Sequence, residues 1–193
     1  MAAAGTRWTN LPNLITLARI CAVPLIVWLM VQHFYLAAFW VFVAAGVSDA
    51  LDGFIAKRFD LATVVGGYLD PIADKALLVS VYVAFGNDGE LPLWLVILVV
   101  FRDVLIVAGA VLFETLTHAL TMQPLAISKV NTAAQIVLAA TTLGADGFGL
   151  ALDLPIRIMV YGVAATTFLS GAAYVVTWAG RIAEMEGADR PAE

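Results

Sequence analysis

The chain has 193 residues, of which 62% are hydrophobic and 13% are charged, and its formal net charge is −5. Its mean hydropathy is +0.94, whereas a soluble domain carries roughly a quarter charged residues. The composition therefore excludes an ordinary soluble domain and favours a protein that lies in lipid. It offers no basic patch for nucleic acid, and a single cysteine, Cys21, excludes a disulfide framework.

Six apolar stretches follow one another along the chain, several of them close to the ~20 residues that a helix needs to cross a bilayer. They are continuous rather than alternating, and backbone groups in lipid must bond within their own segment, so helices are favoured over a barrel. Turn-forming residues at 86–92 and 144–147 separate some of them. The stretches are Leu14–Phe34, Leu36–Ala56, Ile72–Phe85, Leu93–Leu116, Ile127–Leu143 and Ile156–Trp178.

We therefore predict an all-α integral membrane protein with six transmembrane helices. Residues 1–180 form a single membrane domain, and 181–193 form a polar C-terminal tail. Pro12 and Asn13, ahead of the first stretch, fit an N-terminal interfacial helix. Eight Lys and Arg residues fall on the side of the two termini, against Arg157 alone on the other side. This positive-inside bias predicts that both termini are cytoplasmic.

Four aspartates flank the connection between the second and third stretches, which this topology places in the cytoplasm. At about 100° per residue, two of them share one stripe of the second helix with two small residues. The other two follow a glycine in steps of four along one side of the third helix. If the stripes face each other, the four carboxylates converge at the membrane boundary. The first stripe holds Asp49, Asp52, Gly53 and Ala56, and the second holds Gly66, Asp70 and Asp74.

Four clustered anions near lipid need a compensating cation, and hard oxygen ligands select Mg²⁺ or Mn²⁺. Two such ions would bridge a pyrophosphate and stabilise charge on the departing phosphate. Close helix packing is an alternative role for the small residues on these stripes. Lys57 and Arg58 either neutralise phosphates or serve as ordinary positive-inside anchors.

These residues follow the pattern D-x2-D-G-x2-A-[R]-x8-G-x3-D-x3-D, which is similar to the signature of the CDP-alcohol phosphotransferase family. Lys57 stands where the family usually has arginine, so the charge is kept but a two-pronged phosphate contact is lost. The resemblance implies a six-helix membrane enzyme, often a homodimer, with a cavity that faces the cytoplasm. It also implies that Gly53, Ala56, Lys57 and Gly66 bind the CDP-activated lipid.

The same resemblance implies roles for the acids. Asp49, Asp52 and Asp70 bind the metal, and Asp74 completes the metal site and acts as the base. Neighbouring carboxylates raise the pKa of the last acid in such a cluster to lose its proton, and a raised pKa suits Asp74 to the role of base. The oxygen of an acceptor alcohol then attacks the β-phosphorus of the CDP-lipid, and CMP leaves.

Arg102 and Asp103 lie within the fourth stretch, where charges are costly and usually face a cavity. They form either a buried ion pair or a site in which Arg102 holds an acceptor phosphate. The fifth stretch begins with Ser-Lys-Val-Asn-Thr-Ala, which together with Arg-Asp resembles cardiolipin synthases. Phosphatidylglycerophosphate synthases typically have Gly-Lys-x-Lys-Thr and Arg-Glu instead. Lys129 with a neutral Asn131 suits the monoanionic diester of phosphatidylglycerol better than the near-dianion of glycerol phosphate.

We therefore predict phosphatidyl transfer from CDP-diacylglycerol to phosphatidylglycerol, giving cardiolipin and CMP, with Arg102, Lys129 and Asn131 binding the acceptor. The expected location is a bacterial inner membrane, with the active site facing the cytoplasm. The alternative is a phosphatidylglycerophosphate synthase that uses glycerol 3-phosphate. A divalent-cation transporter is disfavoured, because conducting acids belong near the bilayer midplane and these acids lie at helix ends.

Overall fold

The computed structural model of the protein describes residues 11–59, 64–117 and 125–188, and within them the side chains of 17–50, 73, 75–109 and 125–180. This part of the chain folds into helices joined by short turns and contains no strand. The all-helical class predicted from composition is therefore confirmed. The helices are α1 (Leu11–Val31), α2 (Tyr35–Phe59), α3 (Val64–Asp88), α4 (Leu93–Thr117), α5 (Ala126–Phe148) and α6 (Asp153–Ala188).

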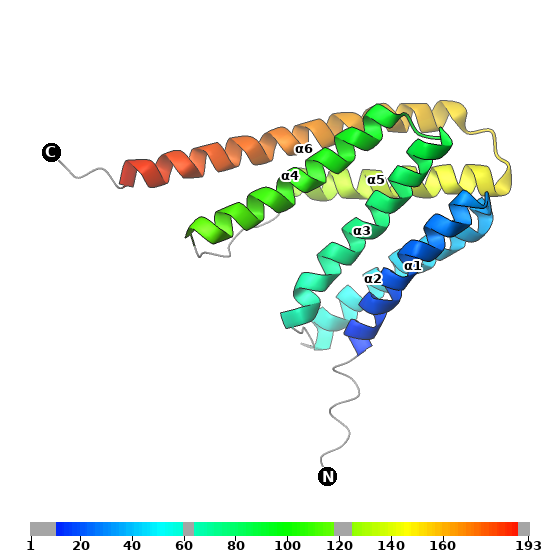
Figure 1. Cartoon of the computed structure of the whole chain (residues 1–193), viewed down its shortest axis with the longest axis horizontal. Coiled ribbons are helices and arrows are strands. Elements are labelled where there is room, and N and C mark those ends of the chain that lie inside the picture. Colours follow the sequence, from blue (N-terminus) through cyan, green and yellow to red (C-terminus); the bar gives the residue numbers. More distant parts are fainter. Residues whose placement is uncertain (1–10, 60–63, 118–124, 189–193) are drawn as a thin grey trace, which may run out of the picture.

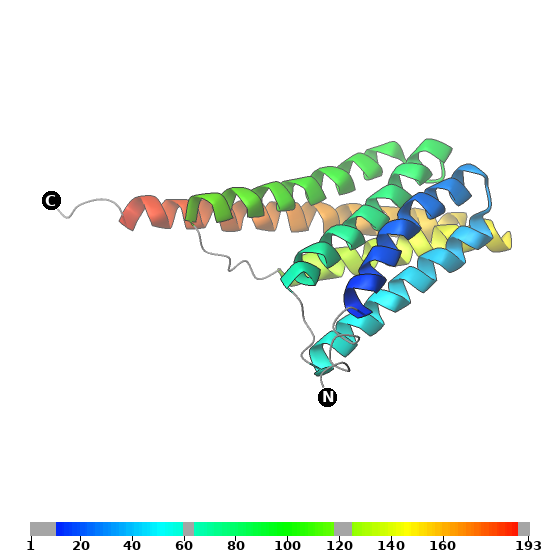
Figure 2. The same cartoon turned by 60° about the horizontal axis from the view of Figure 1, so that its bottom comes forward.

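The helices converge at one end of the molecule and diverge toward the other (Figure 1). The short turns between α1 and α2, between α3 and α4, and between α5 and α6 all lie at the converging end. Helix α1 packs on α2 and α3, and α5 packs on α2 and α6. Helices α4 and α6 lie side by side, which Figure 2 also shows. This order places α3 between the α1–α2 pair and the α4–α6 pair, in contact with α5.

The apolar core lies where α1, α3, α4 and α5 meet, toward the converging end. Its largest fully buried side chains come from the second half of α3 and from the helices around it, and a turn residue, Leu91, closes it. Burial of such side chains stabilises the bundle by roughly 1.5–3 kcal/mol each when water is the reference solvent. Prominent members are Ile26, Met30, Tyr82, Phe85, Leu95 and Leu138.

Polarity is distributed in the opposite way to that of a soluble protein. Buried side chains include two arginines, an aspartate, an asparagine and a glutamine, while large apolar side chains such as Phe101 and Phe168 are 63% and 67% exposed. A broad exposed apolar surface calls for a covering partner or for lipid, and charges inside a lipid-embedded bundle face its interior. The buried polar residues are Arg19, Arg102, Asp103, Asn131, Gln135, Thr142, Thr167 and Ser170.

Within the described residues, one helical stretch, Asp153–Gly180, is long and apolar enough by length and composition to cross a membrane. The apolar stretches Leu17–Val31 and Tyr35–Ala50 are shorter. Six membrane spans and cytoplasmic termini therefore stay predictions. The interfacial N-terminal helix also stays one, because residues 1–10 lie outside the described part, and from Leu11 onward α1 is a single helix.

Several boundaries differ from those expected. Helix α3 continues to Asp88, so the turn predicted at 86–92 begins inside a helix. The turn predicted at 144–147 is wrong, because α5 continues to Phe148 and ends at Gly149, whose left-handed φ of 65° lets its N–H bond to the carbonyl of Ala145. Glycine adopts that conformation without a steric penalty. Helix α6 runs past residue 180 to Ala188, so the predicted tail begins inside a helix.

Candidate active site

The aspartates of the predicted metal site lie on two helices, as expected. Helix α2 carries Asp49 and Asp52, and α3 carries Asp70 and Asp74. Both segments are continuous helix, so the spacings that define the two stripes hold. The side chains of Asp52, Asp70 and Asp74 lie outside the described ones, and their convergence with Asp49 stays a prediction.

The predicted CDP-lipid residues share these two segments. Gly53, Ala56 and Lys57 follow Asp49 on α2, and Gly66 lies at the start of α3. Their contacts lie outside the described side chains. Their roles, like those of the acids, therefore stay predictions.

Asp49 forms an ion pair with an arginine of the first helix. An Oδ1 atom of Asp49 lies 2.8 Å from a guanidinium nitrogen of Arg19. Arg19 is buried, at 3% exposure, while the side chain of Asp49 is 41% exposed. The charge of this carboxylate is thus partly balanced by the protein, and its open side faces a cavity. No sequence pattern predicts this pair, since the two residues belong to different helices and their spacing shows no periodicity.

The cavity beside Asp49 has a volume of about 320 Å³. Among the described side chains, its charged lining consists of Asp49, Arg19 and Lys75, and Thr132 adds a hydroxyl. The rest is mostly apolar, with side chains from α2, α3 and α5, among them Phe42 and Ile136. A chamber of this kind can accept a charged headgroup together with the beginning of its lipid chains.

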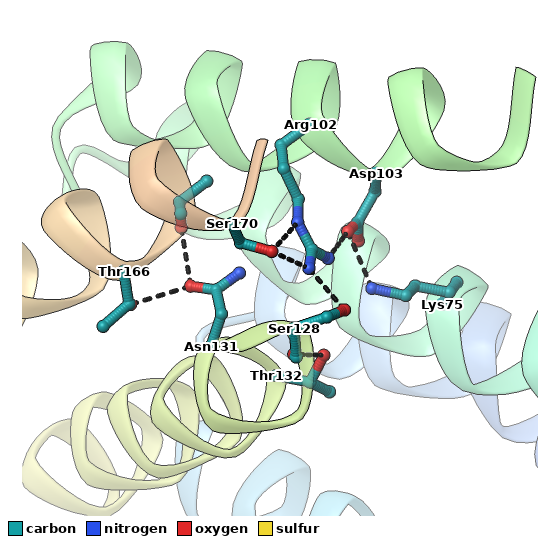
Figure 3. A network of polar contacts seen from close by, with 9 residues as sticks. Lys75, Arg102, Asp103, Ser128, Asn131, Thr132, Thr166 and Ser170 are labelled. Carbon is teal, nitrogen blue, oxygen red and sulfur yellow. Dashed lines mark hydrogen bonds and ion pairs between the residues drawn. The ribbon is translucent and has the colours of Figure 1, made fainter. Parts of the chain in front are cut away.

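A second cluster of charges lies deeper between α3, α4, α5 and α6 (Figure 3). The Arg102 guanidinium is 2% exposed. It donates from Nη1 to Asp103 at 2.7 Å, from Nη2 to Ser128 at 2.6 Å, and from Nε to Ser170 at 3.2 Å. All three of its nitrogens therefore have partners within the protein. The predicted buried ion pair with Asp103 is present, and a phosphate contact by Arg102 stays a prediction.

Asp103 also binds a lysine on another helix. Its Oδ1 atom, which accepts from Arg102, lies 2.7 Å from Nζ of Lys75. Asp103 is 6% exposed and Lys75 is 32% exposed, so the chain of charges runs from the interior of the bundle to the wall of the cavity. Lys75 is one of the eight basic residues on the side of the termini, and no local sequence pattern links it to Asp103.

The two predicted acceptor residues on α5 differ in their surroundings. Lys129 is exposed at the start of the helix. Asn131 is fully buried, and its Oδ1 atom accepts hydrogen bonds from Thr166 and Thr167 on α6, each 2.8 Å long. On the same helix, Thr132 rather than Asn131 lines the cavity.

The structure describes the side chains of only some of the predicted metal ligands. Among the described side chains, no group of three or more His, Cys, Asp or Glu residues could hold a metal ion. Asp49 is the one predicted ligand whose side chain is described, and its exposed carboxylate on the cavity wall suits an oxygen ligand of a hard divalent cation. A site for Mg²⁺ or Mn²⁺ formed by this aspartate and the other three therefore stays a prediction.

Comparison with known proteins gives the family. The family model described as CDP-alcohol phosphatidyltransferase matches residues 9–179, which include both aspartate-bearing helices and the α4 and α5 residues. The chain belongs to the CDP-alcohol phosphatidyltransferase family. The resemblance inferred from the aspartate pattern is thereby confirmed, and members of this family are membrane proteins.

Relatives in the family carry two kinds of names. A rice protein named CDP-diacylglycerol–glycerol-3-phosphate 3-phosphatidyltransferase 1, chloroplastic, is 38% identical, covering 89% of this chain and 58% of its own length. Human cardiolipin synthase (CMP-forming) is 33% identical, covering 86% of this chain and 60% of its own length. A Rickettsia bellii protein with the glycerol-3-phosphate name is 33% identical over 86% of this chain and 93% of its own length. The chain thus spans about three fifths of the first two relatives.

Proposed function

We propose that the protein is a membrane phosphatidyltransferase that moves the phosphatidyl group of CDP-diacylglycerol to phosphatidylglycerol, producing cardiolipin and CMP. The observation that carries this proposal is the cavity beside Asp49. There an aspartate of the family pattern lies next to Lys75 and an apolar wall. Such a chamber suits a reaction in which both reactants carry an anionic headgroup and fatty chains.

In this proposal Asp49, Asp52, Asp70 and Asp74 hold two divalent ions, Mg²⁺ or Mn²⁺. When bound, these ions stabilise negative charge on the pyrophosphate and on the departing CMP. Arg19 holds the carboxylate of Asp49 in place from α1. Asp74 takes the proton of the acceptor hydroxyl, the hydroxyl oxygen bonds to phosphorus, and the bond from that phosphorus to CMP breaks.

The choice of acceptor rests on charge and polarity. Asn131 is neutral and fully buried, with its Oδ1 atom bonded to Thr166 and Thr167 of α6, so α5 presents Lys129 as its one cation near this end. A monoanionic phosphodiester needs less positive charge than the near-dianion of a phosphomonoester. The apolar side chains of the cavity likewise favour a lipid acceptor over a small water-soluble one.

The second candidate is a phosphatidylglycerophosphate synthase, which would use glycerol 3-phosphate. The rice and Rickettsia relatives with that type of name favour it. Placement in a bacterial inner membrane with the site toward the cytoplasm, and assembly as a homodimer, complete the proposal.

The deciding experiment supplies purified protein in detergent with CDP-diacylglycerol and Mg²⁺ or Mn²⁺, and with each acceptor in turn. We expect CMP release and cardiolipin, identified by mass spectrometry, with phosphatidylglycerol, and no turnover after chelation of the metal. Product with glycerol 3-phosphate alone would establish the second candidate. No CMP release with either acceptor would refute the proposed function.

A variant pair tests the role of the cavity aspartate. We expect Asp49→Asn to lower kcat by more than about 100-fold, because even residues behind metal ligands typically contribute 10- to 100-fold. Asp153→Asn changes an exposed acid at the start of α6, at the opposite end of the bundle, and serves as the matched control. Equal activity of the two variants would contradict a role for Asp49 in the reaction.

A further inference from the structure

Arg102, Asp103 and Lys75 form a charge network behind the cavity, and Arg102 itself is fully occupied within it. Each nitrogen of the Arg102 guanidinium contacts Asp103, Ser128 or Ser170, and these partners come from α4, α5 and α6. At 2% exposure the group has no open side among the described side chains. Arg102 thus fixes three helices relative to one another, and its charge is directed to Asp103 (Figure 3).

Asp103 transmits this arrangement to α3. One carboxylate oxygen accepts from both Arg102 and Lys75, at 2.7 Å in each case. The described network therefore contains two cations and one anion, and its unbalanced positive charge lies nearest to Lys75, the most exposed of the three. The ion pair with Asp103 thus holds the ammonium group of Lys75 in one place, at a cost in side-chain conformational freedom.

Lys75 faces the cavity that contains Asp49. The other charged residues of the lining, Arg19 and Asp49, form an ion pair with each other. Among the described side chains, Lys75 is consequently the cation that supplies surplus positive charge to the chamber. Its surroundings of aliphatic side chains and one hydroxyl, Thr132, suit a phosphate that is esterified to a lipid.

We propose that Lys75 binds a substrate phosphate in this cavity, and that Asp103, held by Arg102, positions it. The inference rests on the proposed function and adds a residue to that site. The phosphate belongs either to CDP-diacylglycerol or to the acceptor, and the two share the same chemistry of an anionic oxygen beside an ammonium group.

The test measures steady-state kinetics for Lys75→Met while each substrate is varied separately. We expect KM to rise by at least about tenfold for one of the two, which corresponds to about 1.4 kcal/mol. A rise for CDP-diacylglycerol identifies the donor phosphate, and a rise for phosphatidylglycerol identifies the acceptor phosphate. Lys75→Arg keeps the charge and should recover most of the loss. Arg157→Met removes an exposed cation near the start of α6, at the converging end of the bundle, and is the matched control.

Asp103→Asn tests the positioning. It keeps the shape of the side chain but weakens the hold on Lys75, so we expect a smaller rise of the same KM. Combined with Lys75→Met it should add little, because the residue that it positions is then absent. Full additivity of the two changes would overturn the positioning role.

A readout without turnover separates this inference from the proposed function. Each lipid is added to wild type and to Lys75→Met, and the shift of the unfolding temperature is recorded. We expect a shift in wild type that is reduced in the variant for one lipid. If wild type releases no CMP, the proposed function fails while this measurement still decides on Lys75. Unchanged KM values together with unchanged shifts would overturn the inference.

Discussion

Asn131 shows how a polar side chain is fixed between two helices of this bundle. It is fully buried on α5, and its oxygen accepts hydroxyl hydrogen bonds from Thr166 and Thr167 on α6. Thr167 is fully buried as well. Because Asn131 and Thr167 are both fully buried, each depends on the other for this hydrogen bond. The contact therefore determines how α5 and α6 lie against each other at the level of the candidate site.

Asn131→Leu removes both hydrogen bonds and leaves the Thr167 hydroxyl without its described partner. We expect the variant to lose about 1–3 kcal/mol of stability, the usual cost of a buried polar group that has lost its partner. Thermal unfolding of the detergent-solubilised protein measures this effect. Val130→Leu, at the exposed neighbouring position, is the control and should unfold like wild type. Equal unfolding temperatures for both variants would show that the contact contributes nothing.

At this scale the sequence predicted residue types better than partners. Arg102 and Asp103 stood out because charges are rare in apolar helices, and a buried pair was one of the two alternatives considered. Their other partners, Lys75, Ser128 and Ser170, lie 28, 26 and 68 residues away in the chain. Contacts of that separation depend on which helices pack together, and no periodicity within a single helix contains this information.

At the level of the elements, the close approach of α5 to α2 depends on one glycine. A Cβ atom added to Gly147 would lie 2.8 Å from the Cα atom of Leu36 and 2.9 Å from its nitrogen. These are backbone atoms at the beginning of α2, which a side-chain rotation cannot move. Gly162 on α6 has nothing within 4 Å of the same position. The two glycines therefore form a natural comparison.

Gly147→Ala should lower the unfolding temperature, because overpacking against backbone typically costs about 1–3 kcal/mol. Gly162→Ala should leave it unchanged or raise it, since alanine is favoured over glycine in a helix by about 1 kcal/mol. Both variants gain the same helix propensity, so the difference between them reports the helix contact alone. A Gly147→Ala protein as stable as Gly162→Ala would mean that the two helices are not in close contact there.

The helices themselves followed well from hydrophobicity, including the third and fifth, which extend into polar flanks as α3 and α5. Their ends did not. The sequence of 144–147 favours a turn, yet these residues are helical because Gly147 gives the close contact with Leu36 and Gly149 supplies the left-handed cap. Local preference alone does not show which glycine ends α5. The tertiary contact of Gly147 with Leu36 keeps residues 144–147 helical, and the helix ends at Gly149.

For the molecule as a whole, the three turns at the converging end and the aspartate-bearing helix segments lie at opposite ends of the bundle. The distribution of basic and acidic residues can therefore be compared between the two ends of the bundle. Among the described residues, Arg19, Lys57, Lys75 and Lys129 lie toward the end that carries the family pattern, whereas the other end holds acids such as Asp88, Glu90 and Asp146. From this distribution the positive-inside rule predicts a candidate site on the cytoplasmic side and a converging end on the opposite side.

Cysteine labelling in intact cells tests this orientation. Cys21 is first replaced by serine, because it is a free and exposed thiol. In that background, Glu90→Cys introduces a thiol in the turn after α3, and Ala126→Cys introduces one at the exposed start of α5, at the other end of the bundle. We expect a membrane-impermeant maleimide to label position 90 in intact cells and position 126 only after the cells are permeabilised. The reverse pattern would place the aspartates outside the cell, where cytoplasmic CDP-diacylglycerol headgroups do not reach them, and would refute the predicted topology.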